Sequence, residues 1–383
     1  MANTFITTPR IVFGAGSVRQ VGEEVRRLGT DRCLLVTDPG LVEAGISPRV
    51  ERVLMDAGLE VAVYSGVEPD PRYQIAEDCA RTARENNAGC VVAVGGGSSL
   101  DIAKVAAVVA VHGGTVRALF GIDAVPGPGL PVVAVPTTAG TGSEVTPIAI
   151  LSDEDEVLKK GVVSHHLVPR AAVLDPELTM ALPPNVTAAT GMDALIHAIE
   201  AYTSVRAYSL TDHLALRAVE LIQANLRTAY ANGADLGARS AMLEGSLLAG
   251  MAFANAGVTA VHAFAYPLGA RFHVPHGVAN SVMLLSVMRF NMIGCLPRFA
   301  RLARALGCPA GELGVRAQAR KAVDALEELI RDVGVPRRLR DLGVPEDALE
   351  EMARSVTTIT RLLANNPRRI SAEDALTIYR DAY

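Results

Sequence analysis

The sequence lacks the patterns that mark several large classes of protein. It has no block of Lys and Arg and its net charge at pH 7 is −5, so binding to nucleic-acid phosphates is not expected. No run of about 20 strongly apolar residues predicts a membrane span, and the N-terminal residues lack the basic and apolar regions of a signal peptide. The five cysteines form no C-x-x-C pair. These absences predict a cytoplasmic protein with reduced thiols and without a nucleic-acid or membrane partner.

Motifs for covalent catalysis are also missing. The chain contains neither S-x-x-K nor G-x-S-x-G, which place an activated serine in several hydrolase families. If the protein is an enzyme, its chemistry is therefore expected to depend on a cofactor or a metal.

The first half of the chain alternates short apolar runs with helical patterns, which predicts a mainly parallel, Rossmann-like sheet with helices on both faces. The expected strands are 32–37, 60–65, 90–94, 132–136 and 171–174. The expected helices are 16–28, 47–57, 75–86 and 100–111. A short hairpin is expected around 147–163, with a polar turn at 153–156.

The pattern changes at LPPNVTAATG, residues 182–191, where two prolines end whatever precedes them. A new helix is expected to start at Thr187 or Thr190, and no strand pattern follows Gly191. Further helices are expected at 212–231, 237–254, 298–305 and 314–333. A chain of 383 residues can form two cores. We therefore expect an α/β domain over 1–182 and an all-α domain over 183–383.

Two segments near the middle of the chain contain side chains suited to a metal ion. In GMDALIHAIEAYT, Asp193 and His197 are four residues apart, so a helix would place them on one face. The segment GVTAVHAFAYPLGARFHVPHGVAN adds His262 and His276. Three imidazoles and one carboxylate are a plausible ligand set for a divalent ion that activates a bound oxygen. The alternative is that Asp193 pairs locally and that the histidines are ordinary core residues.

A glycine-rich turn occurs in CVVAVGGGSSLDIAK, residues 90–104. The apolar run 91–94 predicts a buried strand, and a helical pattern follows the three glycines. Strand, glycine turn and helix start together point backbone N–H groups at an anion such as a phosphate. The spacing is not G-x-G-x-x-G, so the general dinucleotide fingerprint does not apply, and turns of this kind often bind no ligand.

These motifs resemble those of the iron-containing (group III) alcohol dehydrogenases, which have a dehydroquinate synthase-like fold. The resemblance covers essentially the whole chain. It runs through FGAGSV, GGGSSLDIAK, PTTAGTGSEVT, GMDALIHAIE and PHGVAN to the C-terminal NNPRRISAEDALTIYRDAY.

The resemblance implies roles for residues at matching positions. The metal ligands would be Asp193, His197, His262 and His276. The pyrophosphate turn would include Gly96, Gly97, Ser98 and Asp101, and the segment beside the nicotinamide would include Thr137, Thr138, Thr141 and Ser143. Lys159 matches a position near the cofactor ribose, and Asp70 stands where relatives usually have Asn or a small polar residue.

The implied activity is that of a metal-dependent, NAD(H)-linked alcohol dehydrogenase and aldehyde reductase. Hydride would pass reversibly between the alcohol carbon and C4 of the nicotinamide, with the two domains facing each other across a cleft. The resemblance implies Fe²⁺, although the same ligands suit Zn²⁺. It also implies a small alcohol or aldehyde as substrate and a homodimer or higher homo-oligomer.

The preference for NAD is expected from Asp38, which ends the apolar run CLLVTD. A carboxylate there can accept hydrogen bonds from the ribose hydroxyls and would repel the 2′-phosphate of NADP. The alternative is that Asp38 is a turn residue before Pro39.

The chain departs from the family at Tyr266, where many members have a histidine one helical turn after the third metal ligand. Tyrosine has an ordinary pKa of about 10, against about 6.5 for histidine. Proton relay through Tyr266 is therefore less favourable, and His273 is a candidate substitute or a surface histidine.

The substrate is expected to lie near three apolar residues, Ile148, Phe253 and Leu362, which equally suit ordinary packing. Other functions are compatible with the same fold and the same residues. A hydroxyacid–oxoacid transhydrogenase or a maleylacetate reductase could use the same parts, and a non-catalytic metal-binding or sensory protein could keep the fold.

Overall fold

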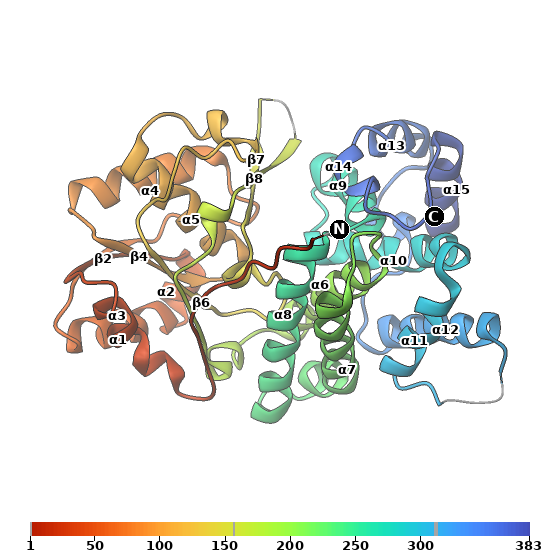
Figure 1. Cartoon of the computed structure of the whole chain (residues 1–383), viewed down its shortest axis with the longest axis horizontal. Helices are drawn as coiled ribbons and strands as arrows, with labels where there is room; N and C mark the ends of the chain where they lie inside the picture. Colours follow the sequence, from red (N-terminus) through yellow and green to blue (C-terminus); the bar gives the residue numbers. More distant parts are fainter. Residues whose placement is uncertain (1, 156–157, 310–312) are drawn as a thin grey trace. The chain divides into compact units, whose positions relative to one another are not determined.

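The computed structural model describes residues 2–155, 158–309 and 313–383 (Figure 1). The chain forms two compact units, Met1–Ala181 and Leu182–Tyr383.

A six-stranded parallel sheet forms the centre of the first unit, in the order β1-β9-β6-β4-β2-β3. Its strands are Ile11–Phe13 (β1), Arg32–Val36 (β2), Glu60–Tyr64 (β3), Cys90–Gly95 (β4), Val132–Pro136 (β6) and Ala171–Leu174 (β9). The predicted Rossmann-like sheet is confirmed, and each predicted strand lies within one residue of its observed bounds. The strand β1 was not predicted, because three residues carry too little periodicity.

Both faces of this sheet are buried, which explains why its strands are continuous apolar runs. Along β2, Leu34 belongs to one core cluster and Leu35 to the other. The first cluster is covered by α4 (Tyr73–Glu85) and α5 (Gly97–His112), and the second by α1 (Val21–Arg26) and α3 (Ile46–Asp56). The short helix α2 (Pro39–Glu43) follows β2.

A second sheet of three strands contains the predicted hairpin. Strands β7 (Ile148–Asp153) and β8 (Leu158–Val163) pair antiparallel, and β5 (Gly121–Ile122) pairs with β8. The hairpin is confirmed, and part of its polar turn, Glu156, lies outside the described residues.

The second unit contains helices and no strand in the part of the chain that the structure describes, as predicted. The helices are α6 (Pro184–Thr203), α7 (Ser209–Ala231), α8 (Leu236–Ala256), α9 (Ala260–Phe272), α10 (His276–Met292), α11 (Leu296–Ala305), α12 (Val315–Asp332), α13 (Leu349–Val356), α14 (Thr360–Leu363) and α15 (Ala372–Ala382). The predicted start of α6 at Thr187 or Thr190 is wrong. The helix begins at Pro184, because proline is favourable in the first turn, where its missing N–H has no intrahelical acceptor.

One helical stretch, His276–Ala305, is long and apolar enough to span a bilayer by length and composition. This differs from the expectation that no stretch would meet such a test. Most of this stretch is buried inside the protein, as in the core helix of a globular domain.

Candidate metal centre and nucleotide-binding turn

Three helices of the second unit contribute the predicted metal ligands. Asp193 and His197 lie one turn apart on α6, His262 lies in the first turn of α9, and His276 is the first residue of α10. The first turn of α10 approaches α6 closely, because a Cβ at Gly277 would lie 2.3 Å from the backbone oxygen of Ala189. Glycine at this position therefore allows His276 to approach the ligands on α6.

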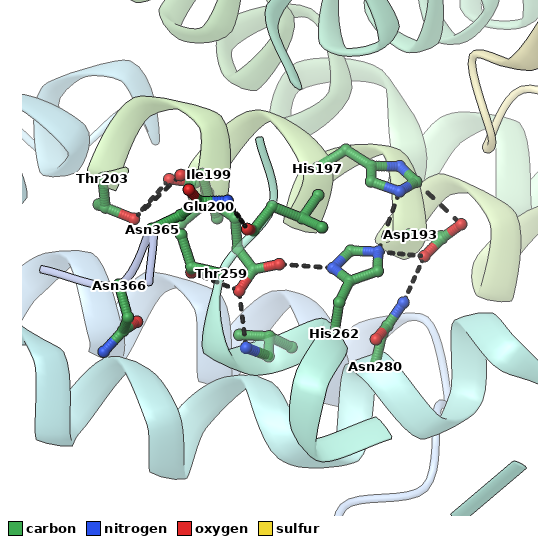
Figure 2. A network of polar contacts seen from close by, with 12 residues as sticks. Asp193, His197, Ile199, Glu200, Thr203, Thr259, His262, Asn280, Asn365 and Asn366 are labelled. Carbon is green, nitrogen blue, oxygen red and sulfur yellow. Dashed lines mark hydrogen bonds and ion pairs between the residues drawn. The ribbon is translucent and has the colours of Figure 1, made fainter. Parts of the chain in front are cut away.

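Ligand atoms of Asp193, His262 and His276 lie within 4.8 Å of one another, and His197 joins this group through His262 and Asp193 (Figure 2 shows Asp193, His197 and His262). Oδ1 of Asp193 lies 3.9 Å from Nε2 of His262 and 3.8 Å from Nε2 of His276. Nε2 of His197 lies 2.9 Å from Nε2 of His262, and its Nδ1 lies 4.0 Å from Oδ2 of Asp193. Asp193, His197 and His262 are buried, whereas the side chain of His276 is 35% exposed. His276 therefore marks the accessible side of the cluster.

The environment of Asp193 and His197 favours the protonation states that bind metals. Burial by itself would raise the pKa of the Asp193 carboxyl, but the nearby histidines and the amide of Asn280 outweigh it, and the net pKa is lowered. Burial lowers the pKa of His197 to about 4. At neutral pH, Asp193 is ionised and His197 is uncharged.

Two further residues of this cluster were not identified from the sequence. Glu200, on the same face of α6, accepts a hydrogen bond from Nδ1 of His262 at 2.5 Å. Asn280 donates to Oδ1 of Asp193 at 2.7 Å, and its Nδ2 lies 3.2 Å from Nε2 of His276. Their spacing in the sequence could have identified them. Glu200 follows His197 by three residues and Asn280 follows His276 by four, which places each on the same helix face as a proposed ligand.

The residues expected to lie near the substrate, and those expected to relay a proton, differ in how far they are buried. Phe253, on α8, stacks on His197 with ring centroids 4.3 Å apart and an interplanar angle of 18°. Tyr266 is half-buried on α9, and burial raises the pKa of its hydroxyl. His273 is exposed and ends α9 in a left-handed conformation, with φ 52°. Leu362 on α14 is 1% exposed.

In the first unit, the glycine turn joins β4 to α5 and contacts the loop after β6. A Cβ at Gly97 would lie 2.7 Å from Cγ2 of Thr141, and one at Gly96 would lie 3.4 Å from the Thr138 side chain. Ser98 is half-buried in the first turn of α5. The turn thus presents the unpaired N–H groups of a helix start, as an anion site requires. Thr137 is buried, and its N–H donates to the oxygen of Gly95.

Asp101 and Ser143 are bonded to each other within the first unit. Asp101 accepts from the Ser143 hydroxyl at 2.5 Å and from the backbone N–H of Ile150 at 2.8 Å. Ile148 is half-buried at the start of β7. These bonds fix the loop between β6 and β7.

The lysine at the centre of this arrangement was not singled out from the sequence. Lys104 is 1% exposed, and its Nζ donates to the Ser143 hydroxyl at 2.7 Å and to the backbone oxygens of Thr146 and Ile148 at 3.1 and 2.9 Å. Burial lowers its pKa to about 8, so it is charged at neutral pH.

The remaining residues expected to bind the cofactor have structural partners. Asp38 caps α2 by accepting from the backbone N–H of Leu41 at 3.1 Å, as the turn alternative predicted. Lys159 on β8 forms an ion pair with Asp70 at 2.6 Å.

Comparison with known proteins identifies the family. The model of iron-containing alcohol dehydrogenases matches residues 8–176, and the model of the C-terminal part of the Fe-containing alcohol dehydrogenase family matches residues 187–383. The chain belongs to the iron-containing alcohol dehydrogenase family.

Individual relatives of this alcohol dehydrogenase family match along the full chain. The long-chain-alcohol dehydrogenase 1 of Geobacillus thermodenitrificans is 44% identical, over 99% of this chain and 98% of its own. A crystal structure of 1,3-propanediol oxidoreductase matches with a TM-score of 0.98 at 40% identity and covers 100% of both chains. Sulfoacetaldehyde reductase from Bifidobacterium kashiwanohense in complex with NAD⁺ matches with a TM-score of 0.90 at 31% identity, over 100% and 99% of the two chains.

Proposed function

We propose that the protein is a metal-dependent, NAD(H)-linked alcohol dehydrogenase that also reduces the corresponding aldehydes. The observation that carries this proposal is the convergence of one carboxylate and three imidazoles within the helical unit of an iron-containing alcohol dehydrogenase. The NAD⁺ complex of sulfoacetaldehyde reductase, which covers 100% of this chain at 31% identity, supports the cofactor.

The donor set suits a divalent metal. Asp193 is ionised, and Glu200 bonds Nδ1 of His262, which leaves Nε2 of the neutral ring with a lone pair. The family description favours iron, and one carboxylate with three imidazoles suits zinc as well. The bound metal would supply Lewis-acid polarisation of the substrate oxygen.

We further propose that residues 1–182 bind the dinucleotide and residues 183–383 hold the metal and the reacting groups. The N–H groups at Gly96, Gly97 and Ser98 would bind the pyrophosphate. Loop 137–143, held by Asp101 and Lys104, would contact the nicotinamide half. We also propose a cytoplasmic homodimer or higher homo-oligomer that acts on small alcohols, with no nucleic-acid or membrane partner. This rests on composition and family resemblance.

An absorbance assay for NADH across alcohols tests the function and the substrate class. Apolar Ile148, Phe253 and Leu362 are proposed to lie near the substrate, and a buried CH₂ group contributes about 0.8 kcal/mol. Each added methylene should therefore raise kcat/KM by up to about fourfold until the pocket is full, and short to medium unbranched primary alcohols should be preferred.

The measurement compares ethanol, 1-propanol, 1-butanol, 1,2-propanediol and 1,3-propanediol at one pH. Burying a second hydroxyl without a partner costs about 1–3 kcal/mol, so 1-propanol should exceed both diols. A diol that exceeds 1-propanol would contradict the apolar pocket. Absence of steady-state NADH formation with every alcohol would contradict the dehydrogenase activity and favour a transhydrogenase.

Replacing Asp38 tests the cofactor preference. Asp38→Gly should raise the ratio of NADP to NAD activity by about fivefold or more, because two charges about 4 Å apart interact by about 1 kcal/mol even in water. The ratio of kcat/KM values for the two cofactors is the measurement. Asp38→Asn controls for loss of the helix cap. Its amide oxygen can keep the cap of α2, so this variant removes only the charge. A wild-type preference for NADP would overturn this assignment.

A further inference from the structure

The carboxylate of Glu200 is entirely buried. It contacts the proposed metal ligand His262 through Nδ1 and is not itself one of the proposed ligands. Its relative exposure is 0%, and it accepts three hydrogen bonds (Figure 2). Oε1 accepts from the Thr259 hydroxyl and from the N–H of Val261, both at 2.6 Å. Oε2 accepts from Nδ1 of His262 at 2.5 Å. These three hydrogen-bond partners are the N-cap residue of α9, Thr259, and two residues of its first turn, Val261 and His262.

These contacts fix both the position and the tautomer of His262. An ionised carboxylate can only accept hydrogen bonds, so Nδ1 of His262 must carry the proton. In the neutral ring, Nε2 then keeps its lone pair on the side that faces Nε2 of His197 at 2.9 Å and Oδ1 of Asp193 at 3.9 Å. Only a nitrogen with a free lone pair can bind a metal.

The same carboxylate connects two helices. Thr259 is the N-cap of α9 but makes no side-chain capping bond to that helix, and the N–H of Val261 is bonded by Glu200 instead. Because Glu200 and two of the proposed ligands lie on α6, its bonds hold the first turn of α9 at a set distance from those ligands.

We propose that Glu200 is a positioning residue of the metal centre, which makes His262 a ligand by holding its proton on Nδ1. The inference rests on the proposed metal-dependent function and adds a residue outside the ligand set. It assigns to Glu200 control of metal affinity, and not only a part in packing.

Glu200→Gln provides a sharp test because it conserves volume. The amide oxygen of Gln can still accept from Thr259 and Val261, but its NH₂ group can only donate toward His262. Nδ1 of His262 then becomes the acceptor, the proton moves to Nε2, and the metal loses a ligand. Loss of such a partner typically weakens metal binding by about 10–100-fold.

Thr259→Val is the matched control. It removes one hydrogen bond to Glu200, on the oxygen that does not contact His262. This variant should perturb the packing of α9 while the Nδ1–H tautomer and the affinity for Zn²⁺ stay within about threefold of wild type, a change well below the range expected on loss of the carboxylate.

The experiment measures Zn²⁺ affinity of the metal-free full chain by competition with a chromophoric chelator, and records ¹⁵N NMR of its histidines. Wild type and Thr259→Val should show Nδ1–H at His262, and Glu200→Gln should show Nε2–H with the lower affinity. Equal affinity in Glu200→Gln, or equal losses in both variants, would overturn the inference.

Two outcomes separate this inference from the proposed function. Wild type that binds neither Zn²⁺ nor Fe²⁺ would refute the metal centre itself and the inference with it. Wild type that binds metal but shows Nε2–H at His262 before loading would refute the role of Glu200 alone. This second measurement needs no variant, so it decides the matter even if Glu200→Gln does not fold.

Discussion

Replacing His276 with alanine should abolish turnover and leave the stability of the metal-free protein close to that of wild type. His276 contributes one of the four proposed ligands, and its side chain is 35% exposed at the start of α10. Metal polarisation of a substrate oxygen is worth several kcal/mol of transition-state stabilisation, so the loss in kcat/KM should be about a thousandfold or more. The measurements are NADH formation and metal content after anaerobic purification.

His262→Ala should also abolish turnover, but with a different effect on the fold. It removes one of the three hydrogen-bond donors to the buried Glu200 carboxylate, and a buried acceptor left without a donor costs about 1–3 kcal/mol. The control for both variants is His213→Ala, at an exposed histidine on α7. Full metal content and activity in the His276 variant would contradict the proposed ligand set.

Lys104→Met should lower the free energy of unfolding by about 3–5 kcal/mol at pH 7. The substitution conserves length but removes the charge that neutralises Asp101, at 3.8 Å, and that bonds to Ser143 and Ile148. The backbone oxygens of Thr146 and Ile148 would then lose a donor, and the buried Asp101 carboxylate would lose the positive charge beside it. Denaturant unfolding monitored by circular dichroism measures this loss.

Lys159→Met is the matched control, because Lys159 pairs with Asp70, whose side chain is 51% exposed, and such pairs contribute about 0–1 kcal/mol. The pH dependence supplies a second readout. Burial lowers the pKa of Lys104 from 10.5 to about 8, so the unfolded chain binds more protons between these values and wild-type stability should rise there. Lys104→Met should lack that rise. Similar losses in both variants would contradict a special role for Lys104.

The sequence predicted the parts of the fold that depend on continuous patterns. Strands 132–136 and 171–174 were placed with their observed bounds, since both faces of the sheet are buried and their residues are apolar without interruption. The two prolines predict a break and therefore a later start of α6, whereas Pro183 is the N-cap and Pro184 the first residue of the helix.

The sequence predicts those residues of the candidate site whose type alone indicates metal binding. The histidines and Asp193 are unusual enough in apolar helices to be noticed. Glu200 and Lys104 were missed for one reason: both residue types are usually exposed, and their complete burial follows from partners far along the chain. Glu200 bonds to His262, and Lys104 to the segment 143–148, which no local pattern could reveal.

The position of β1 has a consequence for synthesis of the chain. Ile11 pairs with Ala172 on β9, and β9 separates β1 from β6 in the sheet. β1 precedes the other strands of this sheet in the chain, so its neighbour β9, the last of them, is made after all the rest. At about 5–20 residues per second, this delay is on the order of ten seconds. During that interval the apolar Ile11–Phe13 segment has no strand to pair with. The sheet of the first unit is therefore complete only when its first strand, β1, pairs with its last, β9.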